Sequence, residues 1–202
     1  MNKRLFDLTA SLCGLILLTP LLLLVALWIR RDSPGPALYR QQRVGRDGVV
    51  FRIFKFRTMR HERADGAQLT VGGDPRITRA GHLLRAYKID ELPQLLNVLQ
   101  GSMSLVGPRP EVPRYVARYP ASVRDEVLSV APGITDWASI AFRQENAILA
   151  MASDPERAYL EQVLPAKLAL NQRYVRERSF RKDLSIIGST IAAVVRPWRG
   201  VI

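Results

Sequence analysis

The sequence predicts a predominantly helical α+β protein with a membrane-inserted N-terminal helix and a small β-hairpin. Residues 8–29 are uncharged and rich in leucine, and residues 37–59 are rich in β-branched and aromatic residues around a Gly-containing turn. Much of the remaining chain carries apolar residues at helical spacing. A length of 202 residues fits one compact domain plus an anchor. We therefore expect an anchor over residues 1–31 and a domain over residues 32–202.

The composition is strongly basic, with 30 Lys and Arg against 18 Asp and Glu. Arginine supplies nearly all of the positive charge, and its guanidinium suits forked binding of phosphates. This surface could serve a diphosphate, anionic lipids or nucleic acid, and the anchor favours a membrane. The single cysteine, Cys13, excludes a disulfide within the chain and a Cys-rich zinc site, so a reducing compartment is expected.

The N-terminal apolar segment is long enough to cross a bilayer as one helix. Arg30 and Arg31 follow it without a cleavage pattern, which disfavours a signal peptide. Basic residues lie on both flanks, so charge does not set the orientation. Pro20 removes a backbone donor from the middle of the segment. Two alternatives remain at this point: a spanning helix, which the residues alone favour, and a re-entrant helix bent at Thr19-Pro20.

The expected hairpin has strands over residues 37–44 and 49–59. The two-residue period places Phe51, Ile53, Lys55 and Arg57 on one face, so that apolar residues are followed by cations that could face an anion. After a polar loop over residues 61–75, four helices are expected: residues 77 to 87, residues 90 to 101 with Pro93 in the first turn, an amphipathic helix from 155 to 180, and an apolar helix from 184 to 198. The last either packs on the core or lies in the membrane interface.

Asp90 and Glu91 are the first candidates for chemistry. A helix start stabilises a carboxylate anion, and an ionised carboxylate can attack phosphorus. An isolated pair of this kind more often caps a helix. Cations nearby support a phosphate site, because Arg85 and Lys88 precede the pair and Arg109 is held between two prolines. The two histidines have no partner at metal-ligand spacing, and no P-loop or Gly-x-Ser-x-Gly elbow occurs.

One long motif is decisive. Residues 88–110, KIDELPQLLNVLQGSMSLVGPRP, closely resemble the signature of the bacterial sugar transferase family, the monotopic phosphoglycosyl transferases. Shorter blocks match in the expected order: FKFRTM at 54–59, DPRIT at 74–78, PGIT at 132–135, and Ser179-Phe180 with Asp183. The resemblance covers nearly the whole chain, and a motif of this length is far more specific than a short pattern.

The resemblance implies a ping-pong transfer of a sugar 1-phosphate from a UDP-sugar to polyprenyl (undecaprenyl) phosphate. Asp90 would attack the β-phosphorus, release UMP and hold a covalent phosphosugar. The family's cofactor is Mg²⁺, with Asp90 and Glu91 as the expected ligands. Lys55, Arg85 and Arg109 match positions that resemble anion-binding residues.

The resemblance also implies a re-entrant helix broken at Thr19-Pro20, and it reverses the preference for a spanning helix. The expected protein is monotopic in the bacterial inner membrane, with amphipathic interfacial helices and its catalytic domain on the cytosolic face. Its expected partners are the bilayer, the two substrates, and either a second copy or other enzymes that assemble a glycan. The sequence resembles the minimal catalytic unit, and the multi-helix N-terminal extension of larger members is not expected.

Two positions depart from the family pattern. Ser102 stands where aspartate is common, and Asp136-Trp137-Ala-Ser-Ile replaces the frequent Gly-x-Ala-Gln-Val, so the sugar is not carried over from a relative. A catalytically silent scaffold is the main alternative function, and the intact Asp90-Glu91 pair disfavours it. No nucleic-acid partner is expected, because such a binder needs exposed stacking aromatics and those of the hairpin are expected in its core.

Overall fold

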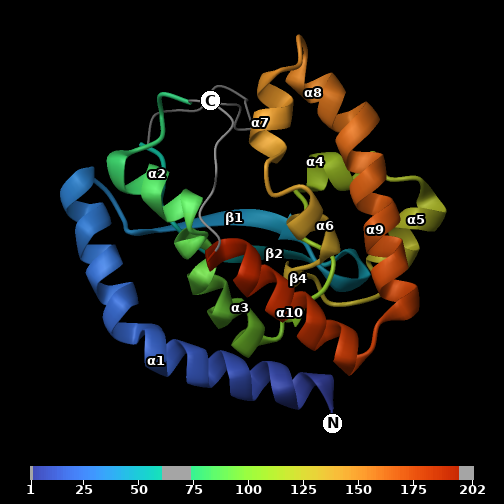
Figure 1. The fold of residues 1–202 in the computed structure, drawn as a ribbon, viewed down its shortest axis with the longest axis horizontal. Coiled ribbons are helices and arrows are strands. Elements are labelled where there is room, and N and C mark those ends of the chain that lie inside the picture. The colour runs from blue at the N-terminus through green and yellow to red at the C-terminus, as the bar shows by residue number, and fades with distance from the viewer. Residues whose placement is uncertain (1, 61–73, 196–202) are drawn as a thin grey trace.

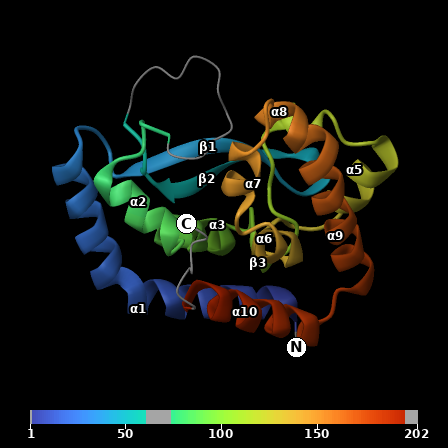
Figure 2. The same cartoon turned by 45° about the horizontal axis from the view of Figure 1, so that its top comes forward.

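A computed structural model of the chain describes residues 2–60 and 74–195. Figure 1 shows a central two-stranded sheet surrounded by helices, and Figure 2 shows that α10 lies beside the N-terminal half of α1 along one side of the molecule. The elements confirm the predominantly helical α+β class. In chain order they are α1 (Lys3–Asp32), β1 (Leu38–Val44), a 3₁₀ turn (Arg46–Gly48), β2 (Val50–Phe56), α2 (Arg79–Ala86), the 3₁₀ helix η2 (Ile89–Gln94), α3 (Leu95–Gln100), β3 (Ser104–Val106), α4 (Pro113–Val116), α5 (Ala121–Val127), β4 (Gly133–Thr135), α6 (Trp137–Ala141), α7 (Glu145–Ala150), α8 (Pro155–Ala158), the π-helical turn η3 (Tyr159–Val163), α9 (Leu164–Glu177) and α10 (Phe180–Val195).

Helix α1 is continuous but bends near its middle (Figures 1 and 2). Pro20 lies inside the helix, where its ring and its missing N–H weaken the backbone ladder. The Thr19 hydroxyl donates to the Leu15 carbonyl at 2.7 Å. Among the described residues, α1 is the one helix long and apolar enough to cross a membrane. Most residues around the bend are exposed to solvent, and the exposed fraction of Leu17 is 80%.

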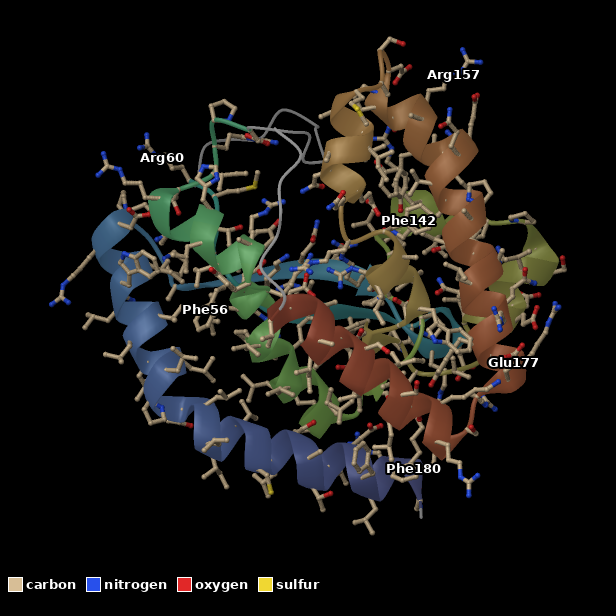
Figure 3. The ribbon with its side chains drawn as sticks, viewed as in Figure 1. Phe56, Arg60, Phe142, Arg157, Glu177 and Phe180 are labelled. Carbon is tan, nitrogen blue, oxygen red and sulfur yellow. The ribbon has the colours of Figure 1, made fainter. Side chains whose placement is uncertain are left out.

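The two ends of α1 dock on the same domain through different chemistry. The N-terminal end uses polar groups, because Arg4 donates to the Val98 carbonyl at 2.6 Å and Lys3 pairs with Asp183 at 2.6 Å. The rings of Phe6 and Phe180 also meet edge to face, 5.2 Å apart. Figure 3 shows Phe180 at the start of α10, close to the N-terminal end of α1. The C-terminal end is mainly apolar. There Val25 and Ile29 join a buried cluster that contains Phe56, Ala80 and Leu84.

The hairpin is antiparallel, with Tyr39 opposite Lys55 and Gln41 opposite Ile53. Ile53 is buried and continues the core toward Lys55, as predicted. The prediction that Arg57 could face an anion together with Lys55 is wrong. Arg57 follows the strand end, is 5% exposed, and donates to the carbonyls of Ser33 and Pro34 at the end of α1. Its hydrogen bonds therefore fix the chain where it leaves α1.

The sequence did not predict the parallel pair β3 and β4, which joins the VGPRP and PGIT motifs. Two glycines permit this contact, since a Cβ at Gly107 would collide with the Ala131 carbonyl and one at Gly133 with the Gly107 backbone. The Gly107 N–H donates to the Thr135 carbonyl at 3.1 Å, and the Gly133 N–H to the Pro108 carbonyl at 3.0 Å. Backbone hydrogen bonds thus join the two motifs into one closely packed unit.

Several predicted helices have different bounds. The α-helix expected from Asp90 is preceded by 3₁₀ helix η2, and α3 begins only at Leu95. The long helix predicted over residues 155–180 is α8, η3 and α9 in succession, with a π-helical turn between two α-helices. The last helix begins at Phe180, earlier than expected. Residues 61–73 of the predicted loop lie outside the described residues.

Candidate active site

Asp90 and Glu91 are held in the first turn of η2, directly after a backbone reversal at Lys88. Lys88 adopts the left-handed conformation with φ 56°, which turns the chain out of α2 and into the core. Asp90 is 1% exposed and Glu91 6%. Burying two adjacent carboxylates is costly unless cations accompany them. Two cations from distant parts of the chain do so.

Lys55 of β2 is the first cation. Its Nζ lies 2.9 Å from Asp90 Oδ2 and 3.6 Å from Glu91 Oε1. The hairpin thus brings a predicted phosphate-binding residue to both carboxylates. The Lys55 side chain is 23% exposed, so it lies at the edge of the site and is partly accessible from solvent.

Arg109 is the second cation, and it forms a fork with Glu91. Its Nη1 donates to Oε2 at 2.9 Å and its Nη2 to Oε1 at 2.5 Å. Burial alone would raise the pKa of Glu91, but the charges of Arg109 and Lys55 and the hydrogen bonds from Arg109 outweigh burial and hold this pKa well below its ordinary value. Attraction to Glu91 in turn raises the pKa of Arg109. Glu91 is therefore an anion whose two oxygens already have partners.

Asp90 differs from Glu91 because one of its oxygens has no partner. Oδ2 pairs with Lys55, whereas Oδ1 is buried and makes no hydrogen bond with any described residue. A buried polar atom without a partner is costly, and such atoms cluster at functional sites. The free lone pairs of Oδ1 are the ones available to a phosphorus atom or a cation.

The other predicted cations lie farther out. Arg85 is in the last turn of α2 and makes no ion pair with Asp90 or Glu91 among the described residues. Hydrogen bonds from Arg76, and to a smaller extent the charge of Arg85, lower the pKa of Asp74 instead. The role predicted for Arg85 toward the donor therefore stays a prediction.

A divalent cation would have few protein ligands here. Across residues 2–60 and 74–195, no three His, Cys, Asp or Glu residues are grouped so that they could hold an ion. Glu91 is occupied by Arg109, which leaves Asp90 Oδ1 as the free carboxylate oxygen of the pair. Mg²⁺ commonly keeps several waters and binds through one or two carboxylates plus substrate phosphates. The residues fit an ion of that kind, held by a diphosphate and Asp90.

Ser102, the first departure from the family pattern, has a structural position. Its hydroxyl donates to the Asn97 carbonyl at 3.2 Å, and the Asn97 amide lies 3.3 Å from it. Asn97 in turn binds the edge of β2, where its Oδ1 accepts from the Phe54 N–H at 2.8 Å and its Nδ2 donates to the Arg52 carbonyl at 2.9 Å. Ser102 therefore supports Asn97, the residue that docks α3 on the hairpin. It makes no hydrogen bond with Asp90 or Glu91, the pair that we call the dyad.

Two features of the site were missed from the sequence. Asp136 accepts a hydrogen bond from the Arg109 N–H at 3.1 Å, although it attracted attention only as a departure from the family. A buried ion cluster also lies behind Arg109, and we call it the sealed cluster: Arg43, Glu111, Glu145, Tyr159 and Lys167. An Asp with Ser139 three residues later is a capping signal that could have indicated Asp136. The cluster gives no such signal, because its members are isolated charges in separate elements.

Comparison with known proteins identifies the family. The model of the bacterial sugar transferase family matches residues 1–197. The chain belongs to the bacterial sugar transferase family. The resemblance noted in the sequence is thereby confirmed, and the Asp90-Glu91 pair with its two cations lies within the matched region of this sugar transferase.

Three relatives illustrate the range of the family. An undecaprenyl-phosphate glucose phosphotransferase of Komagataeibacter xylinus is 42% identical over 95% of this chain, which spans 35% of that relative. A UDP-glucose:undecaprenyl-phosphate glucose-1-phosphate transferase of Caulobacter vibrioides is 39% identical over 96% of this chain and 70% of the relative. Exopolysaccharide production protein PSS of Rhizobium leguminosarum bv. phaseoli is 37% identical over 98% of this chain and 97% of the relative. The chain thus spans about a third of some relatives and nearly all of another.

Proposed function

We propose that this sugar transferase moves a sugar 1-phosphate from a UDP-sugar to polyprenyl phosphate through a covalent intermediate on Asp90. The observation that carries the proposal is the asymmetry of the dyad. Asp90 has a buried oxygen with no partner, while Glu91 is saturated by Arg109. Relatives named as transferases of this kind support the reaction class, with glucose 1-phosphate in the name of the Caulobacter protein.

In the first half-reaction, a carboxylate oxygen of Asp90 attacks the β-phosphorus of the donor. The bond from that phosphorus to the bridging oxygen breaks, and UMP leaves with the bridging oxygen. The product is an acyl phosphate that carries the sugar. In the second half-reaction, a phosphate oxygen of the polyprenyl phosphate attacks the same phosphorus, the acyl phosphate bond breaks, and the Asp90 carboxylate is regenerated.

Lys55 and Arg109 supply the positive charge that the reaction needs. Asp90 is nearly inaccessible, and Lys55 is bound to its Oδ2. We infer that Lys55 exchanges this oxygen for a donor phosphate oxygen as the donor enters, which uncovers the nucleophile. Arg109 keeps N–H groups that its fork with Glu91 does not use, and these can bind a phosphate. Asp90 and the donor diphosphate would hold Mg²⁺, whose charge would neutralise the diphosphate and stabilise the UMP leaving group.

Incubation with donor alone tests the covalent mechanism. The protein, Mg²⁺ and each UDP-sugar of a panel are mixed without acceptor, and UMP and the intact protein mass are measured. We expect one UMP per active site and a gain in mass equal to one sugar phosphate. Asp90→Asn abolishes both signals, and Asp154→Asn, which only caps the exposed helix α8, leaves them unchanged. A donor that supports turnover without an adduct would exclude the mechanism, and a folded protein inactive with every donor would favour a scaffold.

We also propose that α1 enters the inner membrane from the cytosolic face and returns to it. Its two ends bind one domain, and the exposed residues around the bend are apolar. A helix that crossed the bilayer would have to lose the contacts at one end. The domain over residues 32–202 would then lie at the headgroups, where the acceptor phosphate is found.

Cysteine labelling tests this topology in a Cys13→Ser background. Asn2→Cys reports the N-terminus, and Val49→Cys in the exposed hairpin turn reports the domain. We expect both to resist an impermeant reagent in intact cells and to react after lysis. Labelling of residue 2 but not residue 49 in intact cells would establish a spanning helix. Pro20→Ala restores the missing N–H and is expected to raise that spanning fraction.

A further inference from the structure

We propose that Asp136 is a positioning residue that fixes Arg109 for donor binding, an inference that rests on the function proposed above. Asp136 is fully buried and uses both of its oxygens. Oδ2 accepts from the Arg109 N–H at 3.1 Å, and Oδ1 accepts from the Ser139 N–H at 2.6 Å, which caps α6. One side chain thus joins the arginine of the site to the start of a helix.

The Asp136 side chain accepts a backbone hydrogen bond just beyond the end of the parallel pair β3 and β4. At the C-terminal end of the parallel pair, the last backbone bond runs from the Gly107 N–H to the carbonyl of Thr135, the residue before Asp136. Arg109 is the next residue with an N–H, because Pro108 and Pro110 have none. Its only hydrogen-bond acceptor among the described residues is the Asp136 carboxylate. Without it, a backbone donor in a half-buried position would lose its partner.

The position of the Arg109 backbone matters because its side chain must reach two anions. The fork to Glu91 sets the plane of the guanidinium. Because the group is planar, this also fixes the directions in which its remaining N–H groups can donate to a phosphate. Prolines on both sides restrict the backbone angles, and Asp136 fixes the remaining freedom of the peptide. The negative charge of Asp136 also adds to the field that keeps Arg109 protonated.

Asp136 is one of the positions that depart from the pattern frequent in the family, which has glycine there. Glycine offers no side-chain acceptor, whereas the buried Asp136 carboxylate joins the Arg109 N–H to the start of α6. Asp154 provides a matched comparison, because it caps α8 through the Arg157 N–H at 3.0 Å but is exposed and touches no site residue.

Asp136→Asn separates the two contacts. An asparagine has one side-chain oxygen, so it cannot accept from both the Arg109 and Ser139 N–H groups, and it remains a good cap for α6. The Arg109 N–H then faces an NH₂ group. Asp136→Ser keeps a capping oxygen with a shorter reach, and it serves as the second variant if the first folds poorly. Asp154→Asn keeps its single cap and is the control.

Calorimetric titration with a UDP-sugar that supports turnover is the test, carried out in an Asp90→Asn background that cannot react. We expect the Asp136 variants to raise the donor Kd at least tenfold with an unchanged number of sites, and Asp154→Asn to leave both values unchanged. In an Arg109→Ala background, Asp136→Asn should add less than twofold. Fewer sites at unchanged Kd, or an equal effect of Asp136→Asn without the arginine, would overturn the proposal. Absence of UMP release by the unaltered protein would instead reject the proposed function.

Discussion

The dyad site and the sealed cluster both hold carboxylates among cations. Pro110 separates them in the sequence, because Arg109 belongs to the dyad site and Glu111 to the sealed cluster. In the sealed cluster each Glu111 oxygen has a partner, because Oε1 accepts from Tyr159 at 2.7 Å and Lys167 at 3.3 Å while Oε2 pairs with Arg43 at 3.4 Å. The Lys167 side chain is 8% exposed and the Arg43 side chain 21%. In the dyad site Asp90 Oδ1 has no partner, and Lys55 and Arg109 are 23% and 30% exposed. The partners of the carboxylate oxygens therefore distinguish the two sites more clearly than the exposure of the cations.

Under the proposed function, this difference separates a reactive site from a structural one. A cluster whose central carboxylate has a partner on each oxygen, as Glu111 has, offers no free oxygen of that carboxylate to a ligand, and its interactions fix the elements that contribute to it. A cluster with one free oxygen and accessible cations can take up a phosphate. Charge density alone does not distinguish the two, since both contain neighbouring carboxylates and cations.

The largest contrast is expected between Asp90→Asn and Glu111→Gln. Asp90→Asn removes the nucleophile, so we expect turnover to fall by roughly a thousandfold or more while the free energy of unfolding changes by less than about 1 kcal/mol. UMP release and chemical unfolding in detergent measure the two quantities. Retained turnover in Asp90→Asn would assign the chemistry to another group.

Glu111→Gln is expected to show the opposite profile. It leaves Lys167 and Arg43 without their buried anion, so we expect the free energy of unfolding to fall by about 3 kcal/mol. Turnover per folded molecule should fall by less than about tenfold, or 1.4 kcal/mol. A larger loss of turnover with an unchanged unfolding midpoint would place Glu111 in the site.

Arginine-to-lysine changes sharpen the comparison. Arg109→Lys cannot form a fork, so we expect kcat/KM for the donor to fall at least tenfold, about 1.4 kcal/mol. Arg43→Lys in the sealed cluster should lower the unfolding midpoint and leave kcat/KM for the donor within about threefold. Normal donor kinetics in Arg109→Lys would show that charge alone is needed.

The sequence predicted the components of the site better than their connections. Asp90, Glu91, Lys55 and Arg109 lie together as the family motif implied, and the hairpin that carries Lys55 could be predicted from its strand pattern. The fork between Arg109 and Glu91 could not be predicted, because it depends on how the loop after β3 returns to η2. Arg57 shows the converse. The two-residue period of the strand predicted that Arg57 faces an anion, but its guanidinium donates instead to backbone carbonyls at the end of α1.

The sealed cluster was unpredictable for a similar reason. Its residues come from β1, the loop after β3, α7, η3 and α9, and each alone resembles a surface charge. Only the packed fold shows that they share one buried volume. Local patterns therefore predict a motif that is contiguous in the chain, and tertiary contacts decide which scattered charges become partners.

The smallest expected effect concerns the pH dependence of stability. Burial would raise the pKa of Glu111, but Lys167, Arg43 and the Tyr159 hydrogen bond lower it, and the pKa of Glu91 is also held below its ordinary value. A carboxylate with a lowered folded pKa stabilises the protein fully above its unfolded pKa of about 4.3, and this contribution is lost as the pH falls through the folded pKa. We therefore expect the unfolding midpoint to be independent of pH near neutrality and to decrease below about pH 4.3.

Since Glu111→Gln and Glu91→Gln each remove one titrating group, each should make the unfolding midpoint depend less steeply on pH in acid, and the double variant should reduce this dependence further. Thermal unfolding in one detergent from about pH 3 to pH 7 measures this, and an unchanged slope in both single variants would show that other carboxylates control acid unfolding.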